Sequence, residues 1–255
     1  MGSLLTTRIE EAKAKGRKAV IPYLPFCHPD CERFWTEIEG MDAAGADVIE
    51  VGVPFSDPVA DGPVIEEAVN ECLERGACLK GILDGLAERK GKLHAAIVLM
   101  GYVNPFMQYG WEKFAADAAA AGVSGLIVPD LPYEEAGEIK ALLRAQGLDL
   151  VPLVGLNTSA DRLALYAEDA SGFAYFVSVL GTTGARDSLP EEVFEKLTLA
   201  RKAFTVPLAL GFGIKTPEQA ARFGDLADAV VIGSAIVSHT KAGGSAAQFL
   251  APFLK

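Results

Sequence analysis

The sequence lacks the features of a membrane protein, a nucleic-acid-binding protein or a secreted protein. No apolar run approaches the roughly 18 residues that a membrane-spanning helix needs, and the N-terminal residues do not follow the signal-peptide pattern. Lys and Arg total 23 against 34 Asp and Glu, giving a net charge of −11 without any basic run. An acidic chain of this kind is not expected to bind nucleic acid. We therefore expect a cytoplasmic protein.

Cysteine is also scarce, with four residues at Cys27, Cys31, Cys72 and Cys78. In a reducing compartment these are expected to be free thiols. Cys27 and Cys31 flank His28, which raises the alternative of a metal site. Structural zinc needs four ligands at suitable spacings, and no second cluster is present, so we predict no metal.

Short β-rich runs alternate with helical patterns along the whole chain. The runs are nearly continuous in apolar residues, which is typical of parallel strands covered by helices. Eight such units in 255 residues predict one α/β domain, residues 1–255, a single (β/α)₈ TIM barrel with an extra N-terminal helix at Leu5–Lys15. A doubly wound open sheet is the alternative, but no GxGxxG turn follows the first strand. The expected strands are Ala19–Leu24, Val48–Val51, Ala96–Met100, Gly125–Val128, Leu150–Leu153, Ala174–Val177, Pro207–Leu210 and Ala229–Ile232.

Further helices are expected between these strands, and an internal echo supports the repetition. The run Ala44–Val51 resembles Ala121–Val128, since each ends a helix on Gly and enters a strand, and residues 227–232 form a weaker copy. The clearest helical patterns are Cys31–Ala44, Pro63–Arg75, Trp111–Ala121, Glu134–Ala145, Ala160–Glu168, Glu191–Arg201 and Pro217–Phe223.

Glu50 stands out because it is a carboxylate within the second strand. Strand side chains alternate between faces, so Glu50 points into the barrel if Ile49 and Val51 face the helices. Burial there would raise its pKa and suit it to proton transfer near neutral pH. The alternative is a structural Glu paired with a buried base.

Two more carboxylates, Asp57 and Asp61, lie in the loop between Gly52 and Pro63. Three prolines restrict this loop and help to fix both side chains. Barrel active sites lie at the C-terminal ends of the strands, which makes both candidates for catalysis. The alternatives are a helix cap for Asp61 and a Ser-Asp-Pro turn for Asp57.

Glycine-rich strand ends late in the chain indicate a phosphate site. Backbone N–H groups at glycines and helix N-termini bind anions, and many barrels bind phosphate after strands seven and eight. Tight turns alone are the alternative. The runs after strands six, seven and eight are Gly181–Gly184, Gly211–Ile214 and Gly233–Ile236. Nearby aromatic residues Tyr102, Tyr175 and Phe212 could hold a flat ring, although Tyr175 could equally be a core residue.

The run Ile49–Pro63 (IEVGVPFSDPVADGP) resembles the signature of the tryptophan synthase α chain family. The resemblance covers nearly the whole chain, in order and at barrel spacing. It continues through Ile21–Tyr23, Met100–Pro105, Val128–Pro132, Thr183–Arg186, Gly211–Ile214 and Gly233–Val237.

This resemblance implies a lyase of tryptophan biosynthesis that cleaves indole-3-glycerol phosphate into indole and glyceraldehyde 3-phosphate by a retro-aldol reaction. Glu50 would be the acid/base that protonates the ring carbon, and Asp61 would pair with the indole N–H. Thr183 would belong to the closing loop. The residues implied to bind substrate are Tyr23, Leu99, Tyr102, Ile127, Tyr175, Thr183, Gly184, Gly211, Phe212, Gly213, Ile232, Gly233 and Ser234.

The resemblance also implies a partner. Pro54, Asp57, Asn104 and Asp130 would dock a tryptophan synthase β chain in an α₂β₂ heterotetramer. The β chain would carry pyridoxal phosphate, and no cofactor is expected in this chain.

After the first strand the chain departs from the family pattern Thr-x-Gly-Asp-Pro. It reads Pro25-Phe26-Cys27-His28-Pro29, so that Gly-Asp becomes Cys27-His28. This change replaces a flexible residue and an acid with a restricted residue and a titratable base. It motivates one alternative to the lyase, a non-catalytic regulatory subunit that binds a phosphorylated ligand. The glycine-rich phosphate runs alone would permit another, a different phosphate-binding barrel enzyme.

Overall fold

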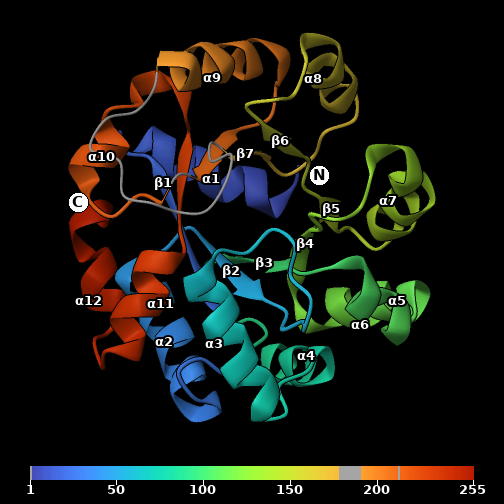
Figure 1. Ribbon diagram of the computed structural model, residues 1–255, viewed down its shortest axis with the longest axis vertical. Coiled ribbons are helices and arrows are strands. Elements are labelled where there is room, and N and C mark those ends of the chain that lie inside the picture. Colours follow the sequence, from blue (N-terminus) through green and yellow to red (C-terminus); the bar gives the residue numbers. More distant parts are fainter. Residues whose placement is uncertain (1, 178–190, 212) are drawn as a thin grey trace.

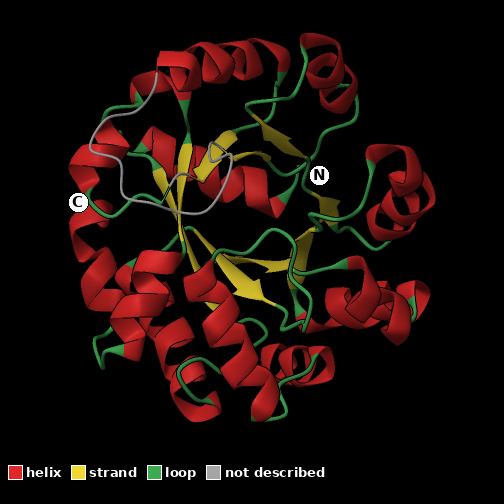
Figure 2. Cartoon of the chain, viewed as in Figure 1, coloured by secondary structure: helices red, strands yellow, loops and turns green. Residues whose placement is uncertain are grey.

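The computed structural model describes residues 2–177, 191–211 and 213–255. In that part of the chain, nine strands form one parallel sheet that helices surround (Figures 1 and 2). The strands are β1 (Ala19–Pro25), β2 (Val48–Gly52), β3 (Ala96–Met100), β4 (Val123–Ile127), β5 (Asp149–Leu150), β6 (Leu153–Gly155), β7 (Ala174–Val177), β8 (Leu208–Gly211) and β9 (Ala229–Ile232).

The helices lie outside the sheet, with the exception of α1. They are α1 (Leu4–Ala14), α2 (Cys31–Ala44), α3 (Pro63–Glu74), α4 (Leu79–Glu88), α5 (Val103–Tyr109), α6 (Trp111–Ala121), α7 (Ala136–Ala145), α8 (Ala160–Ala167), α9 (Glu191–Ala203), α10 (Pro217–Ala221), α11 (Ser234–Lys241) and α12 (Ala246–Leu250), with 3₁₀ turns at Tyr133–Glu135, Gly224–Leu226 and Ala251–Leu254. No helix in the described ranges is long and apolar enough to cross a membrane.

The sheet closes on itself through one extended segment that contributes two strands. In the order β5-β4-β3-β2-β1-β9-β8-β7-β6, the two outermost strands follow one another in the chain. Between them, Val151 donates its N–H to Leu126 O (2.8 Å) and the Pro152 carbonyl accepts from Tyr175 N (2.9 Å). Pro152 has no N–H and interrupts the ladder. The predicted fifth strand, Leu150–Leu153, is therefore split, and the predicted barrel is confirmed.

Two apolar clusters lie on the two faces of this sheet. The inner cluster contains Val48 and Val98 from the strands together with Leu5 and Ile9 from α1. The outer cluster packs the opposite strand face against the surrounding helices. Because α1 packs against the inner cluster, the extra N-terminal helix closes one end of the barrel.

The repeated sequence motif has a structural counterpart. Gly45 and Gly122 end α2 and α6 with φ values of +102° and +90°, which glycine adopts without strain. Asp47 and Asp228 each stand just before a strand and tie it to a neighbour: Asp47 accepts the N–H of Val20 and Asp228 that of Leu208, both at 2.9 Å. The first two units therefore share a helix end at glycine, and the first and third share an aspartate that accepts a backbone N–H of the neighbouring strand.

Helix boundaries agree with the sequence to within a few residues, with one difference in type. Residues Tyr133–Glu135 form a 3₁₀ turn, so α7 begins at Ala136 rather than Glu134. Short helices α4, α5, α11 and α12 had no separate sequence prediction.

The prediction that all four cysteines are free thiols is wrong for two of them. Cys27 and Cys31 form a disulfide, whereas Cys72 and Cys78 are free. The prediction of free thiols was based on a reducing compartment. The redox state of a compartment affects how stable a disulfide is, but it does not determine whether two thiols lie close together. Here a turn after β1, closed by the His28 N–H on Pro25 O (3.0 Å), brings Cys27 beside the first residue of α2.

We predict that the double variant Cys27→Ser, Cys31→Ser unfolds at lower denaturant concentration than the wild type. Closing a loop of about five residues stabilises a protein by roughly 2 kcal/mol through the entropy of the unfolded chain. Thiol titration of the native, unreduced wild type should detect Cys78 readily, and reduction should add two thiols. Detection of four thiols in the unfolded, unreduced protein would show that the disulfide is absent.

Candidate active site

Glu50 lies inside the barrel, as its position in the strand predicts. It is on β2 opposite Tyr23 of β1 and Val98 of β3, and it shares its face with Val48 of the inner cluster. Its side chain is 3% exposed, and Oε2 has no hydrogen-bond partner among the described residues. Burial, followed by the negative charge of Asp61, raises the pKa of Glu50 to about 8. Within the described part of the chain Glu50 has no basic partner, so the alternative of a structural ion pair finds no support there.

Asp61 lies in the loop between β2 and α3, close enough to Glu50 to influence its charge. Burial raises the pKa of Asp61 to about 6, and the Tyr102 hydroxyl, which donates a hydrogen bond to the carboxylate, partly offsets this. The N-cap of α3 is Gly62, so Asp61 is not the helix cap that the sequence left possible.

The loop that carries Asp61 is held by contacts with residues at and just after the end of β3. The Ala60 N–H donates to the Tyr102 hydroxyl (3.1 Å), and the Phe55 and Tyr102 rings lie 5.4 Å apart. At the base of the loop, the Val53 N–H donates to Met100 O (2.7 Å). Tyr102 therefore positions both the loop backbone and the carboxylate.

The two carboxyl groups differ in protonation at neutral pH. With pKa values of about 6 and about 8, Asp61 is mostly ionised and Glu50 is mostly protonated. The two neighbouring groups thus offer a proton donor and a negative charge, the pair that acid/base catalysis with a cationic intermediate requires.

Two tyrosines flank these carboxyl groups, each over a glycine at a strand end. A Cβ atom at Gly52 would lie 2.4 Å from the Tyr23 hydroxyl oxygen, and one at Gly211 would lie 2.6 Å from that of Tyr175. Burial, and then the charges of Glu50 and Asp61, raise the pKa of both phenols well above its ordinary value. The glycines therefore make room for two neutral phenol rings beside the carboxylates.

Leu99 and Ile232, two of the residues expected to line the ring pocket, have their side chains in the outer cluster. Leu99 pairs with Val51 and lies with it in the outer cluster, and Ile232 follows the same alternation on β9. The adjacent residues Met100 and Val231 contact the inner cluster instead. Ile127, also an expected pocket residue, lies in the inner cluster as expected.

The glycines expected to bind phosphate gather at the ends of β8 and β9. Gly211 ends β8, Gly213 has φ +62°, and Gly233 is the N-cap residue of α11, whose first residue is Ser234. A Cβ atom at Gly233 would lie 3.5 Å from the Tyr23 ring, so this helix start is next to the tyrosine pocket. Thr183, Gly184 and Phe212 lie outside the described residues.

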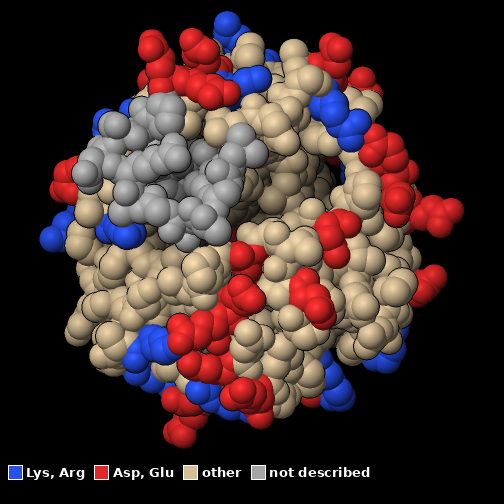
Figure 3. Space-filling view, in the orientation of Figure 1, with Lys and Arg blue, Asp and Glu red and all other residues tan. Residues whose placement is uncertain are grey.

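Sequence reasoning missed a depression beside this site. It has a volume of about 250 Å³ and lies at the ends of β6 and β7. Figure 3 shows the molecule hollowed near the centre of the face it presents, beside the atoms drawn in grey. No motif in the lining sequence had suggested a binding role. The lining residues are Leu153, Val154, Gly155, Leu156, Asn157, Thr158 and Val177.

The residues expected to face a partner lie on the segments that follow β2, β3 and β4, with Asn104 in the first turn of α5. Asp130 accepts the Val103 N–H (2.9 Å), which joins the third and fourth loops. Asp57, Asn104 and Asp130 are exposed, while Pro54 is buried.

Taken together, a closed parallel barrel with an acid and a carboxylate at its strand ends, beside glycine-rich helix starts, defines a (β/α)₈-barrel enzyme of the acid/base type. The comparisons with known proteins specify the family. A sequence model of the family described as tryptophan synthase alpha chain matches residues 9–251. The chain belongs to the tryptophan synthase α chain family.

Relatives and solved structures agree along almost the full length. The tryptophan synthase alpha chain of Solidesulfovibrio magneticus is 63% identical over 249 residues, covering 98% of this chain and 97% of the relative. That of Nitratidesulfovibrio vulgaris strain DP4 is 57% identical over 248 residues, covering 97% and 96%. A structure of Mycobacterium tuberculosis tryptophan synthase superposes with a TM-score of 0.92 at 33% identity, covering 100% of this chain and 98% of that one.

Proposed function

We propose that this chain is the α subunit of a tryptophan synthase and cleaves indole-3-glycerol phosphate to indole and glyceraldehyde 3-phosphate. The observation that carries the proposal is the position of two neighbouring carboxyl groups at the strand ends, Glu50 buried inside the barrel and Asp61 in the loop after β2, with pKa values raised to about 8 and about 6. Either carboxyl group alone would be compatible with many barrel enzymes. The two protonation states together match what this reaction needs.

The reaction begins with proton transfer from Glu50 to the ring carbon that bears the glycerol chain. This step places positive charge on the ring nitrogen, whose N–H donates to the Asp61 carboxylate. The Glu50 carboxylate then takes the proton from the adjacent side-chain hydroxyl. The bond between ring and chain breaks, its electrons neutralise the ring, and the hydroxyl carbon becomes the aldehyde. Glu50 ends protonated, so no cofactor is consumed.

The two ends of the substrate fit the two sides of the pocket. Tyr23, Tyr102, Ile127 and Tyr175 provide apolar surface for the indole ring, and we add Met100 and Val231, which reach the barrel interior. The phosphate would accept hydrogen bonds from backbone N–H groups at the start of α11 and near the end of β8. We assign this end to Gly211, Gly213, Gly233 and Ser234, completed by Gly184, Thr183 and Phe212.

The partner in this proposal is a β chain that carries pyridoxal phosphate, in an α₂β₂ assembly. Val59 and Met107 support the docking face, since they are large apolar residues that are 81% and 58% exposed. They lie on the segments that carry Asp57 and Asn104, and Asp130 is tied to the second of these. Exposed apolar side chains within a polar rim are typical of protein interfaces. We propose a cytoplasmic location for the assembly.

We predict a bell-shaped dependence of kcat/KM on pH. The acid limb should follow Asp61, which must be ionised, with a pKa of about 6, and the alkaline limb should follow Glu50, which must be protonated, with a pKa of about 8. Steady-state indole formation between pH 5 and 10 measures both limbs. Tyr102→Phe removes the hydrogen bond that lowers the Asp61 pKa, so it should move the acid limb to higher pH. An unchanged rate from pH 7 to 10 would contradict the role given to Glu50.

A further inference from the structure

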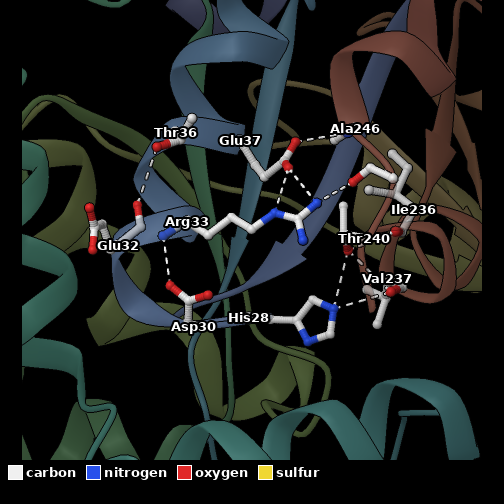
Figure 4. A network of polar contacts seen from close by, with 11 residues as sticks. His28, Asp30, Glu32, Arg33, Thr36, Glu37, Ile236, Val237, Thr240 and Ala246 are labelled. Carbon is white, nitrogen blue, oxygen red and sulfur yellow. Dashed lines mark hydrogen bonds and ion pairs between the residues drawn. The ribbon is translucent and has the colours of Figure 1, made fainter. Parts of the chain in front are cut away.

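His28 is a buried imidazole that joins two segments far apart in the sequence. It lies in the loop between β1 and α2 and is fully buried. Its Nε2 atom lies 3.1 Å from the Val237 carbonyl oxygen and 3.2 Å from the Thr240 hydroxyl, both on α11 (Figure 4). His28 takes no part in the catalytic steps proposed above, so its buried contacts with α11 call for a separate explanation.

The tautomer of His28 follows from these contacts. The Val237 carbonyl can only accept, so Nε2 carries the proton and donates it. Nδ1 is then an acceptor, and it has no hydrogen-bond partner among the described residues. Burial lowers the pKa of His28, which keeps the imidazole neutral.

The loop that carries His28 is held tightly at both ends. On one side the His28 N–H donates to Pro25 O, at the end of β1. On the other side Asp30 caps α2 by accepting the Arg33 N–H (2.8 Å; Figure 4). The Cys27–Cys31 disulfide closes the loop. The imidazole is therefore fixed relative to the strand that carries Tyr23.

His28 contacts helix α11 at Val237 and Thr240, the fourth and seventh of its eight residues, whereas the proposed phosphate-binding end is the first turn, which begins at Ser234 after Gly233. Next to Thr240, Lys241 forms partly exposed ion pairs with Glu67 and Glu71. A displacement of the first turn of α11 would move the backbone N–H groups of that turn relative to Tyr23.

We propose that His28 is a positioning residue that fixes helix α11 against the end of β1 and thereby sets the affinity for the phosphate end of the substrate, which is bound at the first turn of that helix. The inference rests on the proposed function, since it takes Gly233 and Ser234 as phosphate ligands. It predicts a selective effect, because the side chains assigned to the indole ring lie on strands and on the loop after β3, and none of them lies on α11.

The test compares His28→Leu, His28→Gln and the wild type by calorimetric titration with inorganic phosphate and, separately, with indole. His28→Leu should weaken phosphate binding about 3- to 10-fold, as expected for a lost hydrogen bond, and leave indole binding within about twofold. His28→Gln retains an N–H donor and should recover most of the affinity. In indole release assays, His28→Leu should raise KM and leave kcat within about twofold.

Two further variants control this experiment. Thr36→Ala lies on the exposed side of α2, where Thr36 contacts only the Glu32 carbonyl in Figure 4, and should change nothing. Thr240→Val removes the hydroxyl partner from the α11 side and should weaken phosphate binding in the same direction, which keeps the test valid if His28→Leu does not fold. Equal losses for phosphate and indole, or no loss in either variant, would overturn the inference. Failure of the wild type to bind phosphate would instead refute the proposed function.

Discussion

Glu50→Gln should reduce indole release from indole-3-glycerol phosphate by roughly 10²- to 10⁴-fold, the usual contribution of a positioned acid/base group. The amide keeps the size and polarity of the side chain but cannot transfer the proton. Because the loss is in the chemical step, kcat should fall while KM stays nearly constant. Glu74→Gln, a change of the same type at an exposed position of α3, is the matched control and should keep full activity.

The same variant should be more stable than the wild type at alkaline pH. The ordinary Glu pKa of 4.5 is raised to about 8 in the folded chain. Between these values the folded state retains a proton that the unfolded state has lost, so wild-type stability falls as pH rises through this window. The amide does not titrate, so the free energy of unfolding of Glu50→Gln should not show this decline. The difference in the free energy of unfolding between the two proteins should be measured with denaturant at pH 6 and at pH 9. If this difference is the same at both pH values, the raised pKa of Glu50 is wrong.

Asp61→Asn should lower kcat by roughly 10²- to 10³-fold, as the loss of one preorganised electrostatic contact to a developing charge typically does. The ring nitrogen becomes positive only after protonation, so the carboxylate acts mainly on the transition state. Two changes in the pH profile should accompany the loss. The acid limb should disappear, and the alkaline limb should move to lower pH because the Asp61 charge no longer raises the Glu50 pKa.

Asp57→Asn is the matched control for Asp61→Asn. It makes the same change on the same loop, but Asp57 is exposed and its carboxylate accepts a hydrogen bond from the hydroxyl of its neighbour Ser56. The isolated variant should turn over substrate like the wild type, and stimulation by a β chain should be reduced. Equal losses in the two variants would place the effect in loop structure rather than in charge stabilisation.

The barrel was predictable because its signal is repeated. Each parallel strand is buried on both faces, so it reads as an apolar run, and glycines such as Gly45 and Gly122 mark where helices end. The split of the fifth strand at Pro152 depends on which neighbour each half pairs with. That pairing is set by barrel closure, and the local sequence does not encode it.

The candidate site was predictable where strand alternation applies and less so elsewhere. Alternation placed Glu50 in the interior, and the same rule applied to Leu99 would have favoured Met100 for the pocket. The role of Tyr102 in supporting Ala60 depends on two loops meeting, and the contact of His28 with α11 joins residues more than 200 positions apart. Such contacts follow from the closed barrel and leave no local pattern.

The most direct test of the central claim is indole release from indole-3-glycerol phosphate by the purified chain, with and without a tryptophan synthase β chain. We expect slow release by the chain alone and a sharp increase when the β chain is added. Fast release without the β chain would keep the lyase and point to a stand-alone enzyme. No release under either condition would contradict the proposed function.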